Sequence, residues 1–398
     1  MHQQLYIFNP ENDLALAYGG ENYTAPPLAT KLRNDLQMLP LWYASGDGVN
    51  IYSTQSDNQE WLNNISKLFN LKATLLTDKS LANFNGDINV WGWSADMRKR
   101  LIDRGVNVNQ LPKPEYIAKL RELSHRSISI TFHKRITELI GYELAPIPIE
   151  VTTLDDVIAF AMQHPSCYIK APWSSSGRGI YRALDIDAND FKQWSSGIIS
   201  RQGSVMCEIP LDNLGDFAME FYCQDGVSRF VGYSLFQNSV HSAFDFGYLS
   251  SPQSIKLKLL ELFPNKELLS KLEQVVNDVV TETIAPHYTG YVGVDMMVYS
   301  DNGIKRINPA IEINLRTTMG VITTVIGEKL IAKGSEGIYK MEYHNDSKQN
   351  TLKDYASKLT ADFPLVIEDN RIKSGVLFLT PIYADANYCA YIKVLETL

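Results

Sequence analysis

The stretch IEINLRTTMG, residues 311–320, carries an acid, an amide and a guanidinium at alternate positions. Because side chains of extended backbone alternate between two faces, the isoleucines and the leucine of this stretch would share one face. Glu312, Asn314 and Arg316 would share the other face. A strand buried on both faces usually carries apolar groups on each of them. The polar row therefore indicates a ligand.

A second strand-like stretch, YVGVDMMVY at residues 291–299, adds a carboxylate. Its valines and Met296 would share one face, and Asp295 interrupts the other. Asp295, Glu312 and Asn314 then supply oxygen donors from neighbouring strands, a set that suits Mg²⁺ holding phosphates. The alternative is a buried acid–arginine pair with a structural role. Three acceptors against one arginine would leave excess negative charge, which a metal relieves.

The stretch YIKAPWSSSGRGIY, residues 168–181, sets Lys170 at the end of an apolar strand, before three serines and two glycines. Small residues let backbone N–H groups approach an anion closely, and the lysine adds a point charge. The pattern is not a Walker motif, which needs Gly-Lys-Ser/Thr at the start of a helix. The alternative is a glycine-rich hairpin whose lysine extends to solvent.

Length and composition limit the class of protein. The 398 residues suggest two or three domains or one large α/β enzyme, and 45% hydrophobic with 21% charged residues is ordinary for a soluble protein. A net charge of −8 argues against binding nucleic acid or an anionic membrane. No apolar run reaches the roughly 18 residues that span a bilayer. The start, MHQQLYIFNP, indicates a first strand rather than a signal peptide.

The four cysteines, Cys167, Cys207, Cys223 and Cys389, form no CxxC pair. They lie among apolar neighbours and indicate buried, reduced thiols, which fit a cytoplasmic protein.

Local patterns predict alternating strands and helices up to about residue 115, and hence a small parallel sheet. A helix should end at Gly141, and another should begin at a Thr153 cap. A pair of helices should precede the strand–turn–strand unit of residues 291–314, and two strands should lie in the last fifty residues.

The order of lysine strand, Ser/Gly loop, acidic strand and Glu-x-Asn-x-Arg-x-Thr-x-Gly resembles the ATP-grasp superfamily over roughly residues 115–335. The resemblance implies an ATP-grasp fold of mixed α/β and α+β character, preceded by a Rossmann-like domain. It divides the chain into an N-terminal domain (1–115), a small subdomain with a lid loop (116–210) and a C-terminal subdomain with the metal site (211–398).

The resemblance also implies contacts to the nucleotide. Lys170 would contact the α- and β-phosphates beneath a flexible loop at residues 175–179. Glu208 and Leu211 would bind adenine at the hinge, and Asp216 would bind the ribose. The full set implied for ATP is Arg126, Lys170, Ser175, Ser176, Gly177, Glu208, Leu211 and Asp216.

Asp295, Glu312 and Asn314 match the family's magnesium ligands, with Glu312 bridging two ions. Arg316 matches an arginine on the transferring phosphoryl group, so Arg316 and Lys170 are the expected catalytic residues.

The sequence departs from the family pattern at two points. The family's first phosphate lysine is replaced by SHR, so Arg126 is the candidate, with Lys134 less favoured on spacing. In addition, a tight hairpin at SDNG would set Asp295 opposite Asn308 and leave Glu312 about 13 Å away. We therefore expect a longer or bulged connection, with Pro309 disrupting the ladder.

Residues that follow the first strand are candidates for the acceptor pocket, because ligands bind outside the carboxyl ends of strands in open α/β sheets. They are Asn9, Glu11, Asn12 and Asp13, together with Trp93 in WGWS. Asn and Asp are also favoured at helix N-caps, so these residues could instead begin a helix. His241 could bind substrate or serve structure alone.

The function implied is an ATP- and Mg²⁺-dependent ligase that forms an acyl phosphate and joins the acid to an amine or a thiol, releasing ADP and phosphate. The partners would be small-molecule carboxylate and amine substrates, without nucleic acid or membrane, and the resemblance allows a homodimer. A small-molecule kinase and a nucleotide-binding module without catalysis are the alternatives.

Overall fold

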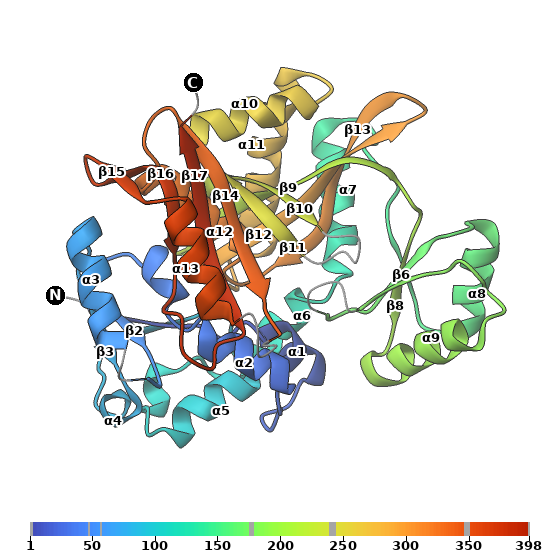
Figure 1. Ribbon diagram of the computed structural model, residues 1–398. Helices are drawn as coiled ribbons and strands as arrows, with labels where there is room; N and C mark the ends of the chain where they lie inside the picture. Colours follow the sequence, from blue (N-terminus) through green and yellow to red (C-terminus); the bar gives the residue numbers. More distant parts are fainter. Residues whose placement is uncertain are drawn as a thin grey trace.

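The computed structural model describes residues 3–46, 48–55, 58–174, 179–238, 244–345 and 351–396. Their strands form three sheets, which we call the N-terminal, small and large sheets. Figure 1 shows the small sheet with helices α8 and α9 set to one side of the other two sheets.

The N-terminal sheet has four parallel strands in the order β3-β2-β1-β4. Its strands are β1 (Gln3–Ile7), β2 (Gly48–Tyr52), β3 (Ala73–Leu76) and β4 (Asp87–Val90). The helices around it are α1 (Asn12–Tyr18), α2 (Pro27–Asp35), η1 (Leu39–Trp42), α3 (Asn58–Phe69), α4 (Asp78–Leu81), α5 (Ala95–Asp103) and η2 (Val108–Gln110). This confirms the predicted small parallel sheet.

The small sheet is antiparallel, in the order β5-β8-β6-β7. Its strands are β5 (Ile149–Val151), β6 (Tyr168–Lys170), β7 (Ile180–Arg182) and β8 (Val205–Glu208), and α8 (Leu154–Gln163) and α9 (Asn189–Gln202) accompany it. One hydrophobic cluster joins these helices to the strands.

The large sheet has nine strands in the order β13-β12-β9-β10-β11-β14-β17-β16-β15. They are β9 (Asp212–Gln224), β10 (Val227–Asn238), β11 (Phe244–Leu249), β12 (Gly290–Asp301), β13 (Ile304–Asn314), β14 (Ser335–Tyr343), β15 (Val366–Glu368), β16 (Arg371–Phe378) and β17 (Tyr388–Glu396). The remaining helices are α6 (Pro114–Leu123), α7 (Ile128–Ile140), α10 (Pro252–Leu262), α11 (Lys266–Thr283), α12 (Met319–Lys329) and α13 (Leu352–Asp362).

The two faces of the large sheet are covered differently. Phe217, Met219 and Phe221 of β9 pack with Val294 and Met296 of β12 in a cluster that includes α7, α10 and α11. A second cluster joins α12, β14, β16 and β17 to the N-terminal sheet. The residues of β9 that alternate with Phe217, Met219 and Phe221 thus have their side chains on the opposite face of the sheet, where a ligand could bind.

The N-terminal part is fixed to the end of the chain by polar contacts as well. The Trp42 indole N–H donates to the Leu379 carbonyl at 2.6 Å, and the Asp35 carboxylate accepts from the backbone N–H groups of Asn387 and Tyr388. Residues from both ends of the sequence can therefore contribute to one site.

Several local predictions are confirmed. Helix α7 ends before Gly141, whose φ of 92° is the left-handed conformation that glycine adopts without strain. Helix α8 begins at Thr153, whose side chain accepts from the Asp156 N–H. The helix pair α10–α11 and the strands β16 and β17 lie where the sequence predicts them.

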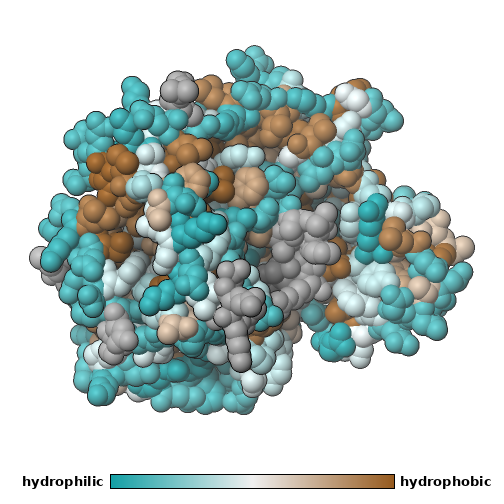
Figure 2. All heavy atoms as spheres, viewed as in Figure 1, coloured by the Kyte–Doolittle hydropathy of each residue, from teal (hydrophilic) through white to brown (hydrophobic). Residues whose placement is uncertain are grey.

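The described residues contain no helix that is long and apolar enough to cross a membrane. The face shown in Figure 2 is mainly hydrophilic, with hydrophobic side chains in smaller groups. All four cysteines are buried and unpaired. The division at residues 115 and 210 stays a prediction, although the three sheets span residues 3–90, 149–208 and 212–396 in turn.

Candidate active site

A cavity of about 540 Å³ lies between the small sheet, the large sheet and the N-terminal helices α1 and α2. Strands β9, β10, β12 and β13 line it from the large sheet. Lys170 and Glu208 reach it from the small sheet, and Asp13 and Leu32 reach it from α1 and α2. The cavity brings together residues that are far apart in the sequence.

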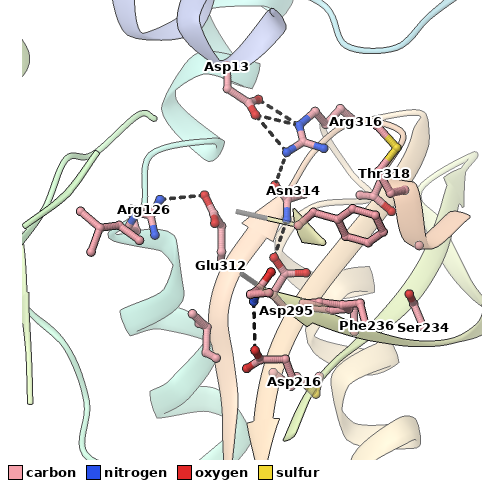
Figure 3. A pocket seen from close by; sticks show the side chains of 18 of the residues that line it. Asp13, Arg126, Asp216, Ser234, Phe236, Asp295, Glu312, Asn314, Arg316 and Thr318 are labelled. Atoms are coloured by element: carbon pink, nitrogen blue, oxygen red, sulfur yellow. Dashed lines mark hydrogen bonds and ion pairs between the residues drawn. The ribbon is translucent and has the colours of Figure 1, made fainter. Parts of the chain in front are cut away.

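Strand register sets the carboxylates of the cavity side by side. Asp295 of β12 lies directly opposite Glu312 of β13, and Gly293 lies opposite Asn314. On the other edge of β12, Gly293 also pairs with Glu220 of β9. The predicted set of Asp295, Glu312 and Asn314 therefore lies together on one face (Figure 3).

The connection between β12 and β13 corrects one expectation. It is a tight two-residue turn at residues 302–303, where both φ angles are positive. In this tight hairpin Asn308 faces Met297, not Asp295. The expectation that a tight hairpin pairs Asp295 with Asn308 is therefore wrong by two residues on β12. The connection is also no longer than the two residues of a tight turn.

The expected bulge is present further along the hairpin. The pairs Asp295–Glu312 and Met297–Asn308 are separated by one residue on β12, Met296. On β13 they are separated by three, residues 309–311. Pro309 has no N–H to donate to the ladder, which favours a disruption at this point. The bulge shifts the register so that Glu312 meets Asp295.

Glu220 is a buried carboxylate and Asp295 is a half-buried one, and neither has an ion-pair partner among the described residues. Burial and the Glu312 carboxylate raise the pKa of Asp295 to about 7. Burial and Asp295 raise the pKa of Glu220 to about 8. Asn314 donates to Asp295 at 3.1 Å, and Thr318 donates to Glu220 at 2.9 Å. The neighbouring arginines therefore do not neutralise all the carboxylates that line this part of the cavity.

Arg316 follows β13 and is held from two sides. Its guanidinium donates to both oxygens of Asp13, at 2.9 and 3.0 Å, and to the Asn314 amide oxygen at 2.9 Å. Figure 3 shows Asp13 reaching from its helix toward Arg316. Burial acts to lower the pKa of Arg316, but the carboxylates of Asp13, Glu312 and Asp295 together outweigh burial and raise the pKa. The cation is therefore fixed at the edge of the polar row.

The two predicted phosphate-binding cations are both buried. Arg126 donates to the Glu312 carboxylate at 2.8 Å and to the Ser174 hydroxyl at 3.1 Å. Lys170 donates to Glu208 at 2.6 Å. Lys170 is only 7% exposed, so the alternative of a lysine extending to solvent is wrong.

The predicted adenine and ribose contacts line the same part of the cavity. Glu208, Leu211 and Asp216 are all lining residues. Burial raises the pKa of Asp216, whose carboxylate accepts hydrogen bonds from Asn213 and Asn238 at 3.0 and 2.9 Å. They lie on the same side of the polar row as Lys170.

The predicted substrate residues near the N-terminus are mostly structural. Asn9 donates to the Gly92 carbonyl at 2.8 Å, and the buried Asn12 side chain lies against Gly92. Neither Asn9, Asn12 nor Trp93 is among the described residues that line the cavity. Their side chains instead fix the two loops to each other, as buried amides must find partners. The lining of this cavity therefore does not support these three substrate assignments, which stay predictions.

Glu11 does line the cavity, but arginines hold its carboxylate. Arg33 and Arg100 both donate to Oε1, the second at 2.9 Å. Trp91, two residues before the predicted Trp93, lines the cavity in its place.

Four predicted site residues lie outside the described residues: Ser175, Ser176, Gly177 and His241.

Sequence reasoning missed one charged residue of the cavity, Glu220, and the ion pair that another, Asp13, makes with Arg316. Glu220 lies four residues after Asp216 on the same strand face, so the period of two along DFAMEF was an available signal. Asp13 lies in the polar loop after the first strand, but its pairing with Arg316 had no local signal, because about three hundred residues separate the two in the sequence.

No family model and no curated protein sequence matches the chain. Solved structures do match. The chain is similar to N5-carboxyaminoimidazole synthetase from Staphylococcus aureus complexed with ADP, with a TM-score of 0.50 and 12% identity, over 99% of this chain and 93% of that one. It is similar to biotin carboxylase from Campylobacter jejuni in an ATP complex, with a TM-score of 0.54 and 11% identity, over 100% and 88%.

A third match is the biotin carboxylase domain of 2-oxoglutarate carboxylase from Hydrogenobacter thermophilus in complex with MgADP. Its TM-score is 0.52, with 9% identity, over 100% of this chain and 86% of that one. At these identities the likenesses show a shared fold over nearly the whole chain.

Proposed function

Because the chain has the ATP-grasp fold, we propose that it is an ATP- and Mg²⁺-dependent ligase that activates a carboxylate as an acyl phosphate and joins it to an amine or a thiol. The observation that carries the proposal is the register of Asp295 with Glu312 and of Gly293 with Asn314. This register gathers oxygen donors in one cavity with Lys170 and Arg316.

The donor chemistry fits magnesium. Asp295, Glu312 and Asn314 offer carboxylate and amide oxygens, which hard cations prefer. The Asp295 and Glu312 carboxylates lie side by side, and their combined negative charge is costly unless a cation joins it. When bound, Mg²⁺ would neutralise phosphate charge and align the nucleotide; the prediction of two ions stays open to test.

Side chains of the cavity would divide the remaining work. Lys170 and Arg126 would hold the phosphates, and Glu208, Leu211 and Asp216 would bind the nucleoside. These residues need one change on binding, because Lys170 and Arg126 now pair with carboxylates and would exchange those partners for phosphate oxygens.

Arg316 would stabilise the negative charge that develops as the phosphoryl group passes to the carboxylate. Its contacts to Asp13 and Asn314 fix its orientation before substrate arrives, which reduces the cost of reorganisation during reaction. The amine or thiol would then attack the acyl carbon, and phosphate would leave.

The discriminating experiment is trapping of the acyl phosphate. The protein would be incubated with ATP, Mg²⁺ and a panel of carboxylic acids, with hydroxylamine in place of the natural nucleophile. We expect an acid-dependent hydroxamate and an equal amount of ADP, and neither product from Glu312→Gln.

Other outcomes identify the alternatives. A stable phosphorylated product with a single co-substrate would indicate a small-molecule kinase. Nucleotide binding without turnover, across all acid and amine pairs, would indicate a binding module. We also propose a cytoplasmic location, supported by four buried free cysteines. The possible homodimer stays a prediction.

A further inference from the structure

Glu220 is a buried charged residue that the proposed chemistry does not use. It is 1% exposed, yet it lines the cavity from β9. Oε1 accepts a hydrogen bond from the Thr318 hydroxyl at 2.9 Å. Oε2 is buried and has no hydrogen-bond partner among the described residues. A carboxylate oxygen in this state is costly unless a ligand completes it.

Two glycines make room for this carboxylate. A Cβ at Gly320 would lie 2.0 Å from Glu220 Oε1, and a Cβ at Gly293 would lie 3.0 Å from Oε2. Any larger residue at Gly320 would therefore displace the carboxylate. The glycines of α12 and β12 thus leave space for the Glu220 carboxylate, although no cationic side chain of the described residues pairs with it.

The position of Glu220 indicates which cation it serves. Along β9 the cavity face carries Asp216, then Ala218, then Glu220, and Ala218 lies opposite Asp295. Glu220 therefore lies on the far side of the Asp295–Glu312 row from Asp216. Glu220 is level with Asn314, because Gly293 of β12 pairs with both. A cation at Glu220 would therefore lie at the Asn314 end of the polar row, on the side away from the nucleoside contacts.

The nearest arginine is already matched. Arg316 donates to both oxygens of Asp13 and to Asn314, so its charge is committed to partners other than Glu220. A cation that pairs with Glu220 would therefore come from a ligand.

Apolar side chains line the same cavity as Glu220. They come from α2, the loop after β4, β11, the start of α12 and β14, and they belong to or pack against one hydrophobic cluster. We call these residues the apolar wall: Leu28, Leu32, Trp91, Phe244, Met319 and Met341. Leu28 lines the cavity outside that cluster. Apolar walls with a few placed polar groups are typical of sites for organic ligands.

We propose that Glu220 binds the ammonium group of the nucleophile and that the apolar wall contacts its hydrocarbon part. The inference rests on the proposed function and narrows it: the nucleophile is an amine with an apolar or aromatic substituent, rather than a thiol, ammonia or a polar amine. The ionic contact to Glu220 would favour an amine over a thiol, and the apolar contacts would favour it over ammonia or a polar amine.

The test compares two probes of nearly equal shape, 2-phenylethylamine and 2-phenylethanol, by calorimetric titration with and without MgADP. A charged hydrogen bond at Glu220 should make the amine bind about tenfold or more tightly than the alcohol. Glu220→Gln keeps the size and the acceptor for Thr318, and it should reduce that ratio to near one. Ethylamine, which lacks the ring, should bind at least about tenfold more weakly than 2-phenylethylamine.

Glu273→Gln is the matched control, because Glu273 on α11 is half-buried, accepts from Tyr233 and lies outside this cavity. It should keep the ratio of the wild type. Equal amine affinity in wild type and Glu220→Gln would overturn the inference, and so would no amine binding at millimolar concentration to protein that binds MgADP.

Two further outcomes separate this inference from the proposed function. If Glu220→Gln weakens only the Mg²⁺ dependence of ADP binding, Glu220 is a metal ligand and the inference is wrong. If the protein does not bind MgADP at all, the proposed function fails, while the titration without nucleotide still decides whether Glu220 binds an amine.

Discussion

Asp295 shows at the scale of one residue why the polar row needs a ligand. Asp295 is half-buried, faces Glu312 across the ladder, and receives one hydrogen bond from Asn314. Glu312 itself pairs with Arg126. The row is therefore only partly neutralised by the protein, and the charged form of Asp295 is disfavoured until a cation binds.

This charge pattern makes the stability of the metal-free protein depend on pH. Burial and Glu312 raise the pKa of Asp295 from 3.8 to about 7. As pH rises from about 4 to about 7, the unfolded chain loses this proton more readily than the folded protein, so stability falls. Asp295→Asn should remove that loss of stability. At pH 8 its free energy of unfolding should exceed that of the wild type by on the order of 2 kcal/mol.

Urea unfolding in EDTA at pH 4.5 and pH 8 measures the effect. The stability difference between Asp295→Asn and wild type should be larger at pH 8 than at pH 4.5. Asp362→Asn, a change at an exposed position on α13, serves as the control and should show no such trend. A difference that is the same at both pH values would contradict the expected state of Asp295.

Arg316 carries the second prediction for a single residue. Lysine cannot reproduce the planar contacts to Asp13 and Asn314, because it offers one point charge instead of a fork. Arg316→Lys should lower ATP consumption by about 100-fold, a typical cost of losing a charge-stabilising donor, with MgADP affinity within about threefold of wild type. Arg306→Lys, at an exposed ion pair with Asp301, should leave both unchanged. Full activity in Arg316→Lys would remove Arg316 from the chemistry.

At the scale of elements, the β12–β13 hairpin determines the geometry of the metal site. Its turn fixes the register at the closed end, and the bulge at residues 309–311 resets that register before Glu312. Without the bulge, Asp295 would not lie opposite Glu312. The Asn302-Gly303 turn and the proline in the strand are both visible in the sequence, which is why the bulge could be predicted.

The turn should tolerate only residues that accept a positive φ. Gly303 has a φ of 85°, so Gly303→Ala should destabilise the protein by about 1 kcal/mol through backbone strain. Gly197 lies inside helix α9, where an added Cβ meets only the mobile end of Arg201. Gly197→Ala should be neutral or stabilising by up to about 1 kcal/mol. Urea unfolding compares the two, and equal effects would contradict the assigned turn.

Helices and strands differed in how far the sequence could predict them. Helix α8 carries its cap at Thr153 and α7 its stop at Gly141, so local residues identify both. The long strands β9 and β10 were not assigned from the sequence as strands of the central sheet. In the sheet, β9 lies beside β12 and β10 lies beside β11. No local sequence pattern predicts which strands pair with each other.

At the scale of the whole molecule, the cavity joins parts of the chain from Asp13 to Tyr388. The polar row could be predicted because its members are close in sequence and share a strand period. Glu220, the apolar wall and the pairing of Asp13 with Arg316 could not be recognised from the sequence. Their roles arise only when α1, α2, β9 and β14 pack around the same space.

The central claim is that this cavity binds a nucleotide through a metal held by the polar row. The most direct measurement is unfolding with ADP, with and without Mg²⁺, on wild type, Glu312→Gln and the exposed control Glu336→Gln. At about a hundred times its dissociation constant, ADP should add roughly 2.7 kcal/mol to the free energy of unfolding.

We expect the gain in wild type and in Glu336→Gln to require Mg²⁺, and the gain in Glu312→Gln to lose that requirement along with most of its size. No gain in any of the proteins at millimolar ADP would contradict the claim. An undiminished, Mg²⁺-dependent gain in Glu312→Gln would equally mean that the metal binds elsewhere.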